Sequence, residues 1–331
     1  MTPAVGMGRS FREVVLARLA RAAVFFVRKA PYPLVTAVFK AVALCAWCFL
    51  PYHRKTSAVQ LRMALGLENP TLMSLRVFLG HAEILVDAVR YAYMSGEEVK
   101  RAVRVEGLEH LERALETGKG VMMITGHVGN WEILSHLPRI LSVEFCVMAQ
   151  RRGDPMIDAI VDDLRSRSGA TILPPTGKAL MLVRELRKGR VIGMVVDGRH
   201  DGADAVMCEV FGMPAPTNPA PAFIAIKGDA VVLPVVAIKN GRCYRVIFTR
   251  PVPASDFGAS RDAVERLSGW MQSQVEHAVR RDPHQWFWLY SRWIPRSLMK
   301  KVVREGLDLE GVVSGAALRR GWTPPGGAPL R

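Results

Sequence analysis

The chain has 331 residues, half of them hydrophobic, and its 45 lysine and arginine residues outnumber its 30 aspartate and glutamate residues to give a net charge of +15. No signature of a nucleic-acid-binding module accompanies this charge, so we attribute it to an anionic bilayer or a phosphorylated substrate and expect no nucleic-acid partner. The five cysteines are odd in number and lie in largely apolar surroundings, which argues against a disulfide framework and for a reducing, cytosol-facing environment.

The N-terminal part has the pattern of a membrane-anchoring region. Residues 9–29 place six arginine and lysine residues among apolar ones, which is typical of a basic amphipathic helix on a membrane surface. The apolar run at 34–50 is somewhat short for the ~20 residues of a spanning helix, and Lys40 near its middle is costly in a bilayer. The run fits a tilted span, an interfacial or re-entrant helix, or a core helix. We favour membrane attachment over a cleaved signal peptide and assign residues 1–55 to this region.

Residues 56–302 are expected to form one catalytic body. Helices fill residues 56–100, where Glu83 and Asp87 lie four apart on a face that we interpret as solvated or salt-bridged. Buried apolar runs then alternate with helical segments. The expected strands are 121–124, 145–149, 171–173, 191–196, 231–236 and 244–248. The expected helices are 108–116, 132–141, 156–169, 179–188 and 270–279. Glycine and proline accumulate after residue 305, and we expect 303–331 to be a disordered tail.

The strongest local pattern lies in the stretch from residue 120 to residue 132. An apolar run breaks at Gly126, presents His127, breaks again at Gly129 and restarts at Asn130, which is a good helix N-cap. This pattern predicts a buried strand, a tight turn and a helix start. Ligands usually bind at the carboxyl ends of strands in α/β sheets, so His127 stands where a site is expected.

The spacing of His127 and Glu132 suggests a base and the carboxylate that orients it. In one continuous helix, residues five apart point about 140° away from each other, but the two glycines make a folded-back approach feasible. A carboxylate near a histidine fixes its tautomer and stabilises the imidazolium, as in acyl-transfer enzymes. The alternative is a hydrogen-bonded loop histidine followed by a helix-start charge that the helix dipole favours.

Two further strand ends carry polar side chains. Arg151 and Arg152 follow the strand expected at 145–149 and are suited to bind a phosphate or to stabilise charge on a thioester oxygen. The alternative for them is a surface basic pair. Asp197 follows the strand expected at 191–196, just as His127 follows its own strand, and the alternative there is a turn-forming aspartate before a glycine.

Four blocks of the chain, at 126–132, 151–158, 209–217 and 283–293, resemble those of the lipid A late acyltransferase family. The family includes lauroyl and myristoyl transferases and acyltransferases of mycobacterial mannolipids. The first block is Gly-His-Val-Gly-Asn-Trp-Glu, the third contains Phe-Gly-Met-Pro, and the last contains Pro-His-Gln-Trp-Phe-Trp and ends in Arg-Trp. The resemblance implies an α/β acyltransferase-type fold, with a mixed, largely parallel sheet flanked by helices and an N-terminal membrane-associated helix.

The resemblance also implies a reaction. A fatty acyl group would move from an acyl thioester, on acyl carrier protein or coenzyme A, to a hydroxyl of a lipid A precursor in an anionic membrane, with neither a metal nor a cofactor. The protein would lie at the bacterial inner membrane with its catalytic body facing the cytoplasm. Alternatives are the same chemistry on a phospholipid or glycolipid, and a non-catalytic membrane protein that binds acidic lipids. The implied catalytic pair is His127 and Glu132, and the candidate substrate-binding residues are Asn130, Arg151, Arg152, Asp197 and Glu209.

Overall fold

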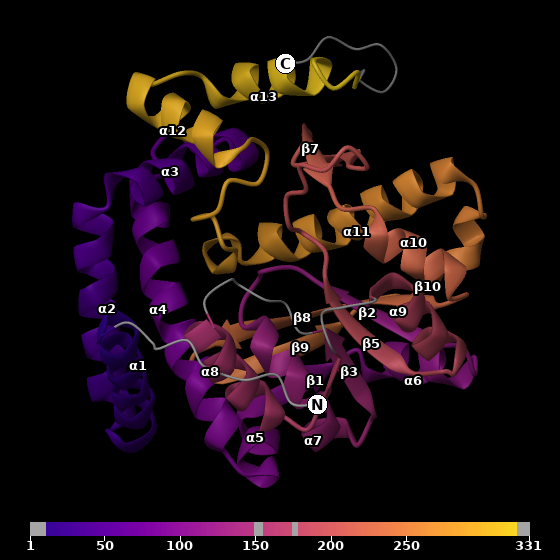
Figure 1. The fold of residues 1–331 in the computed structure, drawn as a ribbon, viewed down its shortest axis with the longest axis horizontal. Helices are drawn as coiled ribbons and strands as arrows, with labels where there is room; N and C mark the ends of the chain where they lie inside the picture. The colour runs from indigo at the N-terminus through magenta and orange to yellow at the C-terminus, as the bar shows by residue number, and fades with distance from the viewer. Residues whose placement is uncertain (1–10, 149–154, 174–177, 323–331) are drawn as a thin grey trace.

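The computed structural model describes residues 11–148, 155–173 and 178–322. Within those ranges the main sheet has eight strands in the order β1-β9-β8-β2-β5-β3-β4, with β10 paired to β8 (Figure 1). The strands are β1 Val103–Glu106, β2 Val121–Thr125, β3 Phe145–Met148, β4 Thr171–Leu173, β5 Val191–Val195, β8 Val231–Asn240, β9 Cys243–Phe248 and β10 Val252–Pro253. Strand β2 runs parallel to both of its neighbours, β5 and β8, whereas β8 runs antiparallel to β9 and β10. The expected mixed, largely parallel sheet is confirmed.

The first four residues of β2 are all apolar because both faces of the sheet are covered. Val121 and Met123 belong to one core cluster, and Met122 and Ile124 belong to another. All four side chains are at most 1 % exposed. The helices that contribute to the first cluster include α5 Gly96–Ala102, α6 Leu108–Glu116 and α7 Leu137–Leu141. Those that contribute to the second include α9 Lys178–Arg187, α10 Ala220–Lys227 and α11 Arg261–Arg281. A strand covered on both sides reads as a continuous hydrophobic run, as this one does.

The N-terminal helices pack along one side of this body (Figure 1). They are α1 Phe11–Lys29, α2 Tyr32–Phe49, α3 Pro51–Leu65 and α4 Thr71–Tyr93. Helix α2, which lies alongside α4, is long and apolar enough to cross a membrane, and 11 % of it is buried. Lys40, the charge inside the apolar run, forms an ion pair with Glu83 of α4. Asp87, one turn further along α4, forms an ion pair with Lys239 and accepts a 2.6 Å hydrogen bond from the Tyr244 hydroxyl. Of the two interpretations of this face, solvated or salt-bridged, the structure supports the salt-bridged one, since Asp87 is buried.

The remaining elements complete the body around the sheet. They are α8 Pro155–Ser166, the antiparallel pair β6 Val206–Val210 and β7 Met213–Thr217, the 3-10 helices η1 Trp131–His136, η2 Ala254–Phe257 and η3 Pro283–Gln285, and the helices α12 Arg296–Glu305 and α13 Leu309–Leu318. The helix expected over 132–141 is divided into η1 and α7. Their junction coincides with Pro138, which enters the first turn of α7 and has no N–H to donate backwards.

Ordered helices occupy part of the expected disordered tail. Helix α13 begins at Asp308, whose side chain caps it by accepting hydrogen bonds from the backbone N–H groups of residues 310 and 311. The helix buries Leu309, Val313 and Ala317 at intervals of four residues, and it packs against α3 and β7. A helical apolar stripe of this kind is enough to hold a short helix on a core. Residues 323–331, where glycine and proline are densest, lie outside the described ranges.

Candidate active site

The turn after β2 is shaped by two glycines that no other residue would replace without a shift. A Cβ atom on Gly126 would lie 2.9 Å from Asp197 Oδ2. Gly129 has a φ of +59°, and a Cβ atom there would lie 2.0 Å from the carbonyl oxygen of Ala237 in β8. Backbone with positive φ and this close an approach requires glycine. The turn therefore presents His127 at the carboxyl end of the central strand, as predicted.

His127 is hydrogen-bonded to the carboxylate of Asp197. Its Nδ1 lies 2.7 Å from Asp197 Oδ1, and its backbone N–H donates to Oδ2 at 2.8 Å. The indole N–H of Trp286 also donates to Oδ2, at 2.7 Å. Strands β2 and β5 are adjacent and parallel, so their carboxyl ends, and the residues that follow, meet at the same edge of the sheet. The sheet thus supplies a buried carboxylate to a histidine that is 70 positions away in sequence.

Asp197 stays ionised in this environment. Burial by itself would raise the pKa of its carboxyl group, but the His127 ring and the donated hydrogen bonds together hold that pKa below its usual value. A carboxylate at Oδ1 requires the hydrogen on Nδ1 of His127. The lone pair of the neutral ring is then on Nε2, which is the tautomer that a general base needs.

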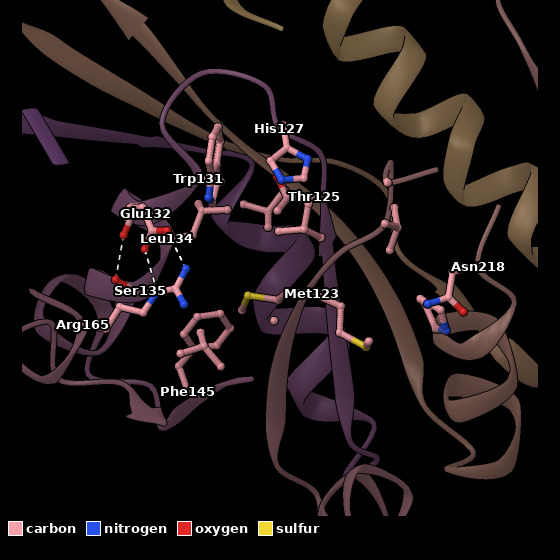
Figure 2. Close-up of a pocket in the computed structure, with 18 of the residues that line it drawn as sticks. Met123, Thr125, His127, Trp131, Glu132, Leu134, Ser135, Phe145, Arg165 and Asn218 are labelled. Carbon is pink, nitrogen blue, oxygen red and sulfur yellow. Dashed lines mark hydrogen bonds and ion pairs between the residues drawn. The ribbon is translucent and has the colours of Figure 1, made fainter. Parts of the chain in front are cut away.

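Glu132 has a different partner from the one we expected. Its carboxylate receives two hydrogen bonds from Arg165 of α8, from Nε at 2.9 Å and from Nη2 at 2.6 Å (Figure 2). The carboxylate on Nδ1 of His127 belongs to Asp197, so the orienting role assigned to Glu132 is corrected. The physical reason is that η1 faces α8, whereas β5 adjoins the histidine's own strand. Burial would lower the pKa of the Arg165 guanidinium, but the hydrogen bonds and charge of Glu132 raise it above its usual value.

A cavity of about 340 Å³ joins these groups. His127, Glu132 and Arg165 line it together with Trp131, whose ring meets the His127 ring edge-on at 4.7 Å between centroids. The lining also has an apolar part, and Figure 2 shows Leu134 and Phe145 beside the Glu132–Arg165 pair and Met123 below His127. The remaining apolar or glycine lining residues there are Val147, Gly193 and Val235. The cavity therefore combines His127 and the Glu132–Arg165 pair, its polar end, with an apolar part around Met123 and Phe145 that we call its apolar end. Arg199, His200 and Asn218 also line it.

The other predicted residues lie in different places. Asn130 is buried beneath the turn, where its backbone N–H donates to the carbonyl oxygen of Ala237 at 2.9 Å, and it is not one of the cavity-lining residues. It precedes η1 as expected but makes no capping hydrogen bond with its side chain. Glu209 lies on β6 with an exposed side chain, also outside the cavity lining. Arg151 and Arg152 lie outside the described residues.

The segment at 283–293, which we call the aromatic block, contacts the turn that carries His127. The backbone N–H of Phe287 donates to the carbonyl oxygen of His127 at 3.1 Å, and Val128 pairs with Trp286 as an antiparallel bridge. Arg292 is 2 % exposed and donates to the Pro216 carbonyl oxygen at 2.8 Å. The arginine therefore joins the fourth block of the sequence to the third. Trp286, Trp288 and Trp293 of this block are all buried in the core.

Arg165 was missed by sequence reasoning, since nothing in its own helix distinguishes it from the other charged residues there. Only the docking of α8 beside η1 identifies it. Among the described residues, no group of three or more histidine, cysteine, aspartate or glutamate side chains is arranged to hold a metal ion.

Comparisons with known proteins agree with the expected family. A family model described as bacterial lipid A biosynthesis acyltransferase matches residues 9–294. The phosphatidylinositol mannoside acyltransferase of Mycobacterium tuberculosis (strain CDC 1551 / Oshkosh) is 24 % identical over 194 residues, which are 57 % of this chain and 60 % of the relative. The lipid A biosynthesis lauroyltransferase of Escherichia coli (strain K12) is 24 % identical over 202 residues, which are 60 % of this chain and 64 % of the relative. The chain thus spans about three fifths of the length of these relatives.

Solved structures that are similar to this chain include the 1-acyl-sn-glycerophosphate acyltransferase PlsC of Thermotoga maritima. It has 16 % sequence identity and a TM-score of 0.37, and the match covers 72 % of this chain and 96 % of that one.

Proposed function

We propose, because the chain belongs to the bacterial lipid A biosynthesis acyltransferase family, that it is a membrane-associated acyltransferase. It moves a fatty acyl group from an acyl thioester to a hydroxyl of a lipid A precursor. The observation that carries the proposal is the 2.7 Å contact between His127 and the buried Asp197 carboxylate at the polar end of a cavity whose other end is apolar.

The chemistry follows from that pair. His127 Nε2 takes the proton from the acceptor hydroxyl, and the oxygen attacks the thioester carbonyl carbon. Asp197 stabilises the imidazolium, because an ionised carboxylate at Nδ1 favours the charged ring. The C–S bond then breaks, the new ester remains, and the imidazolium returns the proton to the departing thiolate. The base is regenerated without any covalent intermediate on the protein.

Glu132 and Arg165 act together at the polar end of the cavity. The two-point contact holds the guanidinium in one orientation, and Glu132 thereby serves to position Arg165 in addition to any contact of its own with substrate. A fixed cation there attracts a phosphate of the donor or acceptor, or the negative charge that develops on the thioester oxygen. Arg151 and Arg152 remain candidates for the same role.

The donor's acyl chain occupies the apolar end of the cavity. Gly193 leaves room for the Phe145 ring in this lining, since a Cβ atom on it would lie 2.4 Å from Phe145 Cζ. We favour acyl carrier protein over coenzyme A as the donor's carrier, because a chain with a net charge of +15 attracts an acidic protein.

The membrane assignment rests on α2. Its apolar side chains Leu34, Val42 and Phe49 are each more than half exposed, which suits contact with lipid and not with water. We therefore propose that residues 1–55 attach the protein to the bacterial inner membrane, that residues 56–302 form the catalytic domain, and that this domain faces the cytoplasm.

A second acceptor class has support of its own. The mycobacterial relative is named for a phosphatidylinositol mannoside and is as similar to this chain as the lauroyltransferase is, at 24 % identity. A glycolipid or phospholipid hydroxyl is therefore the second candidate acceptor for the same His127 chemistry.

The test is acyl transfer by the purified full chain, with acyl carrier protein thioester as donor and lipid A precursor or mannosylated phosphatidylinositol as acceptor. His127→Ala should abolish the new ester, whereas His277→Ala, which removes an exposed histidine from α11, should not. If a new ester forms only on mannosylated phosphatidylinositol, the acceptor belongs to the second class and not to the lipid A precursors. Wild-type protein that binds acidic vesicles but transfers no acyl group to either lipid would refute the enzyme and favour a lipid-binding protein.

A further inference from the structure

A second cavity, of about 580 Å³, lies between α2 and α4. We call it the α2–α4 groove. Its walls are formed mainly by apolar side chains, among them Val42 and Ala46 of α2, Ala82 and Leu85 of α4, and Phe287 and Leu289 of the aromatic block. Because Val42 and Leu85 are more than half exposed, the groove is open along the side of α2 that carries exposed apolar residues. A hydrocarbon chain can therefore enter it directly from a bilayer that surrounds α2.

The α2–α4 groove adjoins the active site. Phe287 forms one of its walls, and the centroid of that ring lies 6.4 Å from the His127 ring. Arg199 lines both the groove and the cavity that contains His127. A molecule seated in the groove therefore has one end close to the base, on a path separate from the apolar end that contains Phe145.

His81 of α4 lines the groove and carries an unused hydrogen-bond acceptor. Its Nδ1 lies 2.7 Å from the carbonyl oxygen of Val77, so the ring hydrogen is on Nδ1 and the lone pair is on Nε2. The Nε2 atom is buried and has no hydrogen-bond partner among the described residues. Burial lowers the pKa of His81 to about 4, which keeps the ring neutral at physiological pH. A buried acceptor without a donor is costly, and a ligand hydroxyl or N–H group would satisfy it.

The rim of the groove carries a cation. Arg296 begins α12, is exposed, and holds its guanidinium over the Tyr52 ring at 5.5 Å. It makes no ion pair with a described acidic residue, unlike Arg199, which is paired with Asp201. The groove thus combines an apolar channel, an internal hydrogen-bond acceptor and a positive rim, and these three features are complementary to a hydroxylated lipid with an anionic headgroup.

We propose that the α2–α4 groove binds the acceptor lipid from the bilayer, with a hydrocarbon chain between α2 and α4, a lipid hydroxyl or N–H donating to His81 Nε2, and the anionic headgroup at Arg296. The inference rests on the proposed function and deepens it, because it gives acceptor and donor separate chain sites that meet at His127. The acceptor then arrives laterally from the membrane, and the thioester arrives from the aqueous side.

The occupant is tested by photo-crosslinking of the full chain in detergent micelles. The probe is 1-acyl-lysophosphatidylglycerol with a diazirine at the end of its acyl chain, which has one chain, one anionic phosphate and a hydroxyl beside the ester. Cross-links should map to peptides of α2 and α4. Ala46→Phe fills the groove and should reduce this labelling at least fivefold. Ala41→Phe makes the same change at an exposed position of α2 outside the groove and should leave labelling within twofold of the wild type.

The hydrogen bond is tested with the 2-deoxy form of the same probe. The wild type should label with the hydroxylated probe at about fivefold lower concentration, as expected for one buried hydrogen bond. His81→Phe should abolish this preference, and His81→Gln, which restores an acceptor, should recover it. Thermal unfolding followed by circular dichroism verifies that each variant is folded.

The outcomes separate this inference from the proposed function, because labelling needs no turnover. Labelling unaffected by Ala46→Phe, cross-links confined to the cavity around Met123 and Phe145, or a hydroxyl preference that persists in His81→Phe would each overturn the inference, even if acyl transfer is observed. Groove labelling that follows the expected pattern without any acyl transfer would sustain the groove as a lipid site and reject the proposed reaction.

Discussion

Replacing Asp197 by asparagine should remove the base by changing the tautomer of His127. Asp197 Oδ2 accepts two hydrogen bonds, from the His127 backbone N–H at 2.8 Å and from the Trp286 indole at 2.7 Å, while Oδ1 faces His127 Nδ1. An asparagine has one oxygen, and the two donors fix it at the Oδ2 position. Its NH₂ group then faces Nδ1, which must accept, so the ring hydrogen moves to Nε2, where the lone pair is needed.

The size of the effect follows from the step that is lost. General-base catalysis contributes roughly 10²- to 10⁴-fold, so kcat for Asp197→Asn should fall by about that range. KM for the lipid should stay within about threefold of the wild type, because the variant loses stabilisation of the transition state and not of the bound lipid. The assay is the initial rate of ester formation from a radiolabelled acyl thioester, with circular dichroism to confirm folding.

The chain offers a matched control for this variant. His200 Nε2 and Asp204 Oδ1 are also 2.7 Å apart, but Asp204 is exposed. Asp204→Asn should therefore leave the rate within about twofold, since exposed charge pairs contribute little. If Asp197→Asn retained more than a third of the wild-type kcat, or if both variants lost activity equally, the assignment of the orienting carboxylate to Asp197 would be refuted.

Three further outcomes are expected. Gly129→Ala should lower the free energy of unfolding in urea by at least about 2 kcal/mol, because its Cβ would clash with a β8 carbonyl oxygen. Gly66→Ala is the control: this residue has a φ of +65° and open space around it, so the substitution should lower that free energy by only about 1 kcal/mol. Equal losses in the two variants would contradict the clash. Burial lowers the pKa of His136 to about 4, so the unfolded chain takes up the proton first, and this residue should lower the free energy of unfolding by up to about 3 kcal/mol between pH 6.5 and 4. In unfolding curves measured across this range, His136→Gln should remove that contribution and leave the one from His81, whose pKa burial also lowers to about 4; an unchanged pH dependence would contradict the shift. A double-mutant cycle of Glu132→Gln and Arg165→Gln, measured by unfolding in urea, should give a coupling free energy of about 1–3 kcal/mol. If the two losses of unfolding free energy are additive, the ion pair is not coupled.

The strands of the site could be predicted because a strand that is buried on both faces appears in the sequence as a continuous apolar run. The apolar runs that end at His127 and Asp197 mark two strand ends, and both residues lie where those runs predicted. No such pattern indicates which strands are adjacent in the sheet. That β5, and not another strand, adjoins β2 is decided by how helices cover the whole sheet, so the partner of His127 could not be identified from spacing alone.

Local spacing misled the interpretation of Glu132. A separation of five residues suggested a contact with His127, but the side chain pairs with Arg165, which reaches it from a different helix. The missed helix α13 is the opposite case, because Leu309, Val313 and Ala317 already show a four-residue apolar spacing in the sequence. The prediction of a disordered tail rested on the composition of residues 303–331 as a whole. The glycine and proline residues beyond α13 dominated that average and hid the helix.

The hydrogen bond from Phe287 to the His127 carbonyl has a consequence for biosynthesis. The turn that carries His127 is hydrogen-bonded to a segment that is synthesised some 160 residues later. Strand β1 likewise can pair with β9 only after β9 has been synthesised. Contacts this distant in sequence form slowly, since a long loop has to close before they stabilise anything. A nascent chain on the ribosome therefore carries His127 without its supports until the aromatic block emerges. The turn around His127 thereby reaches its final form only when synthesis of residues 56–302 is nearly finished.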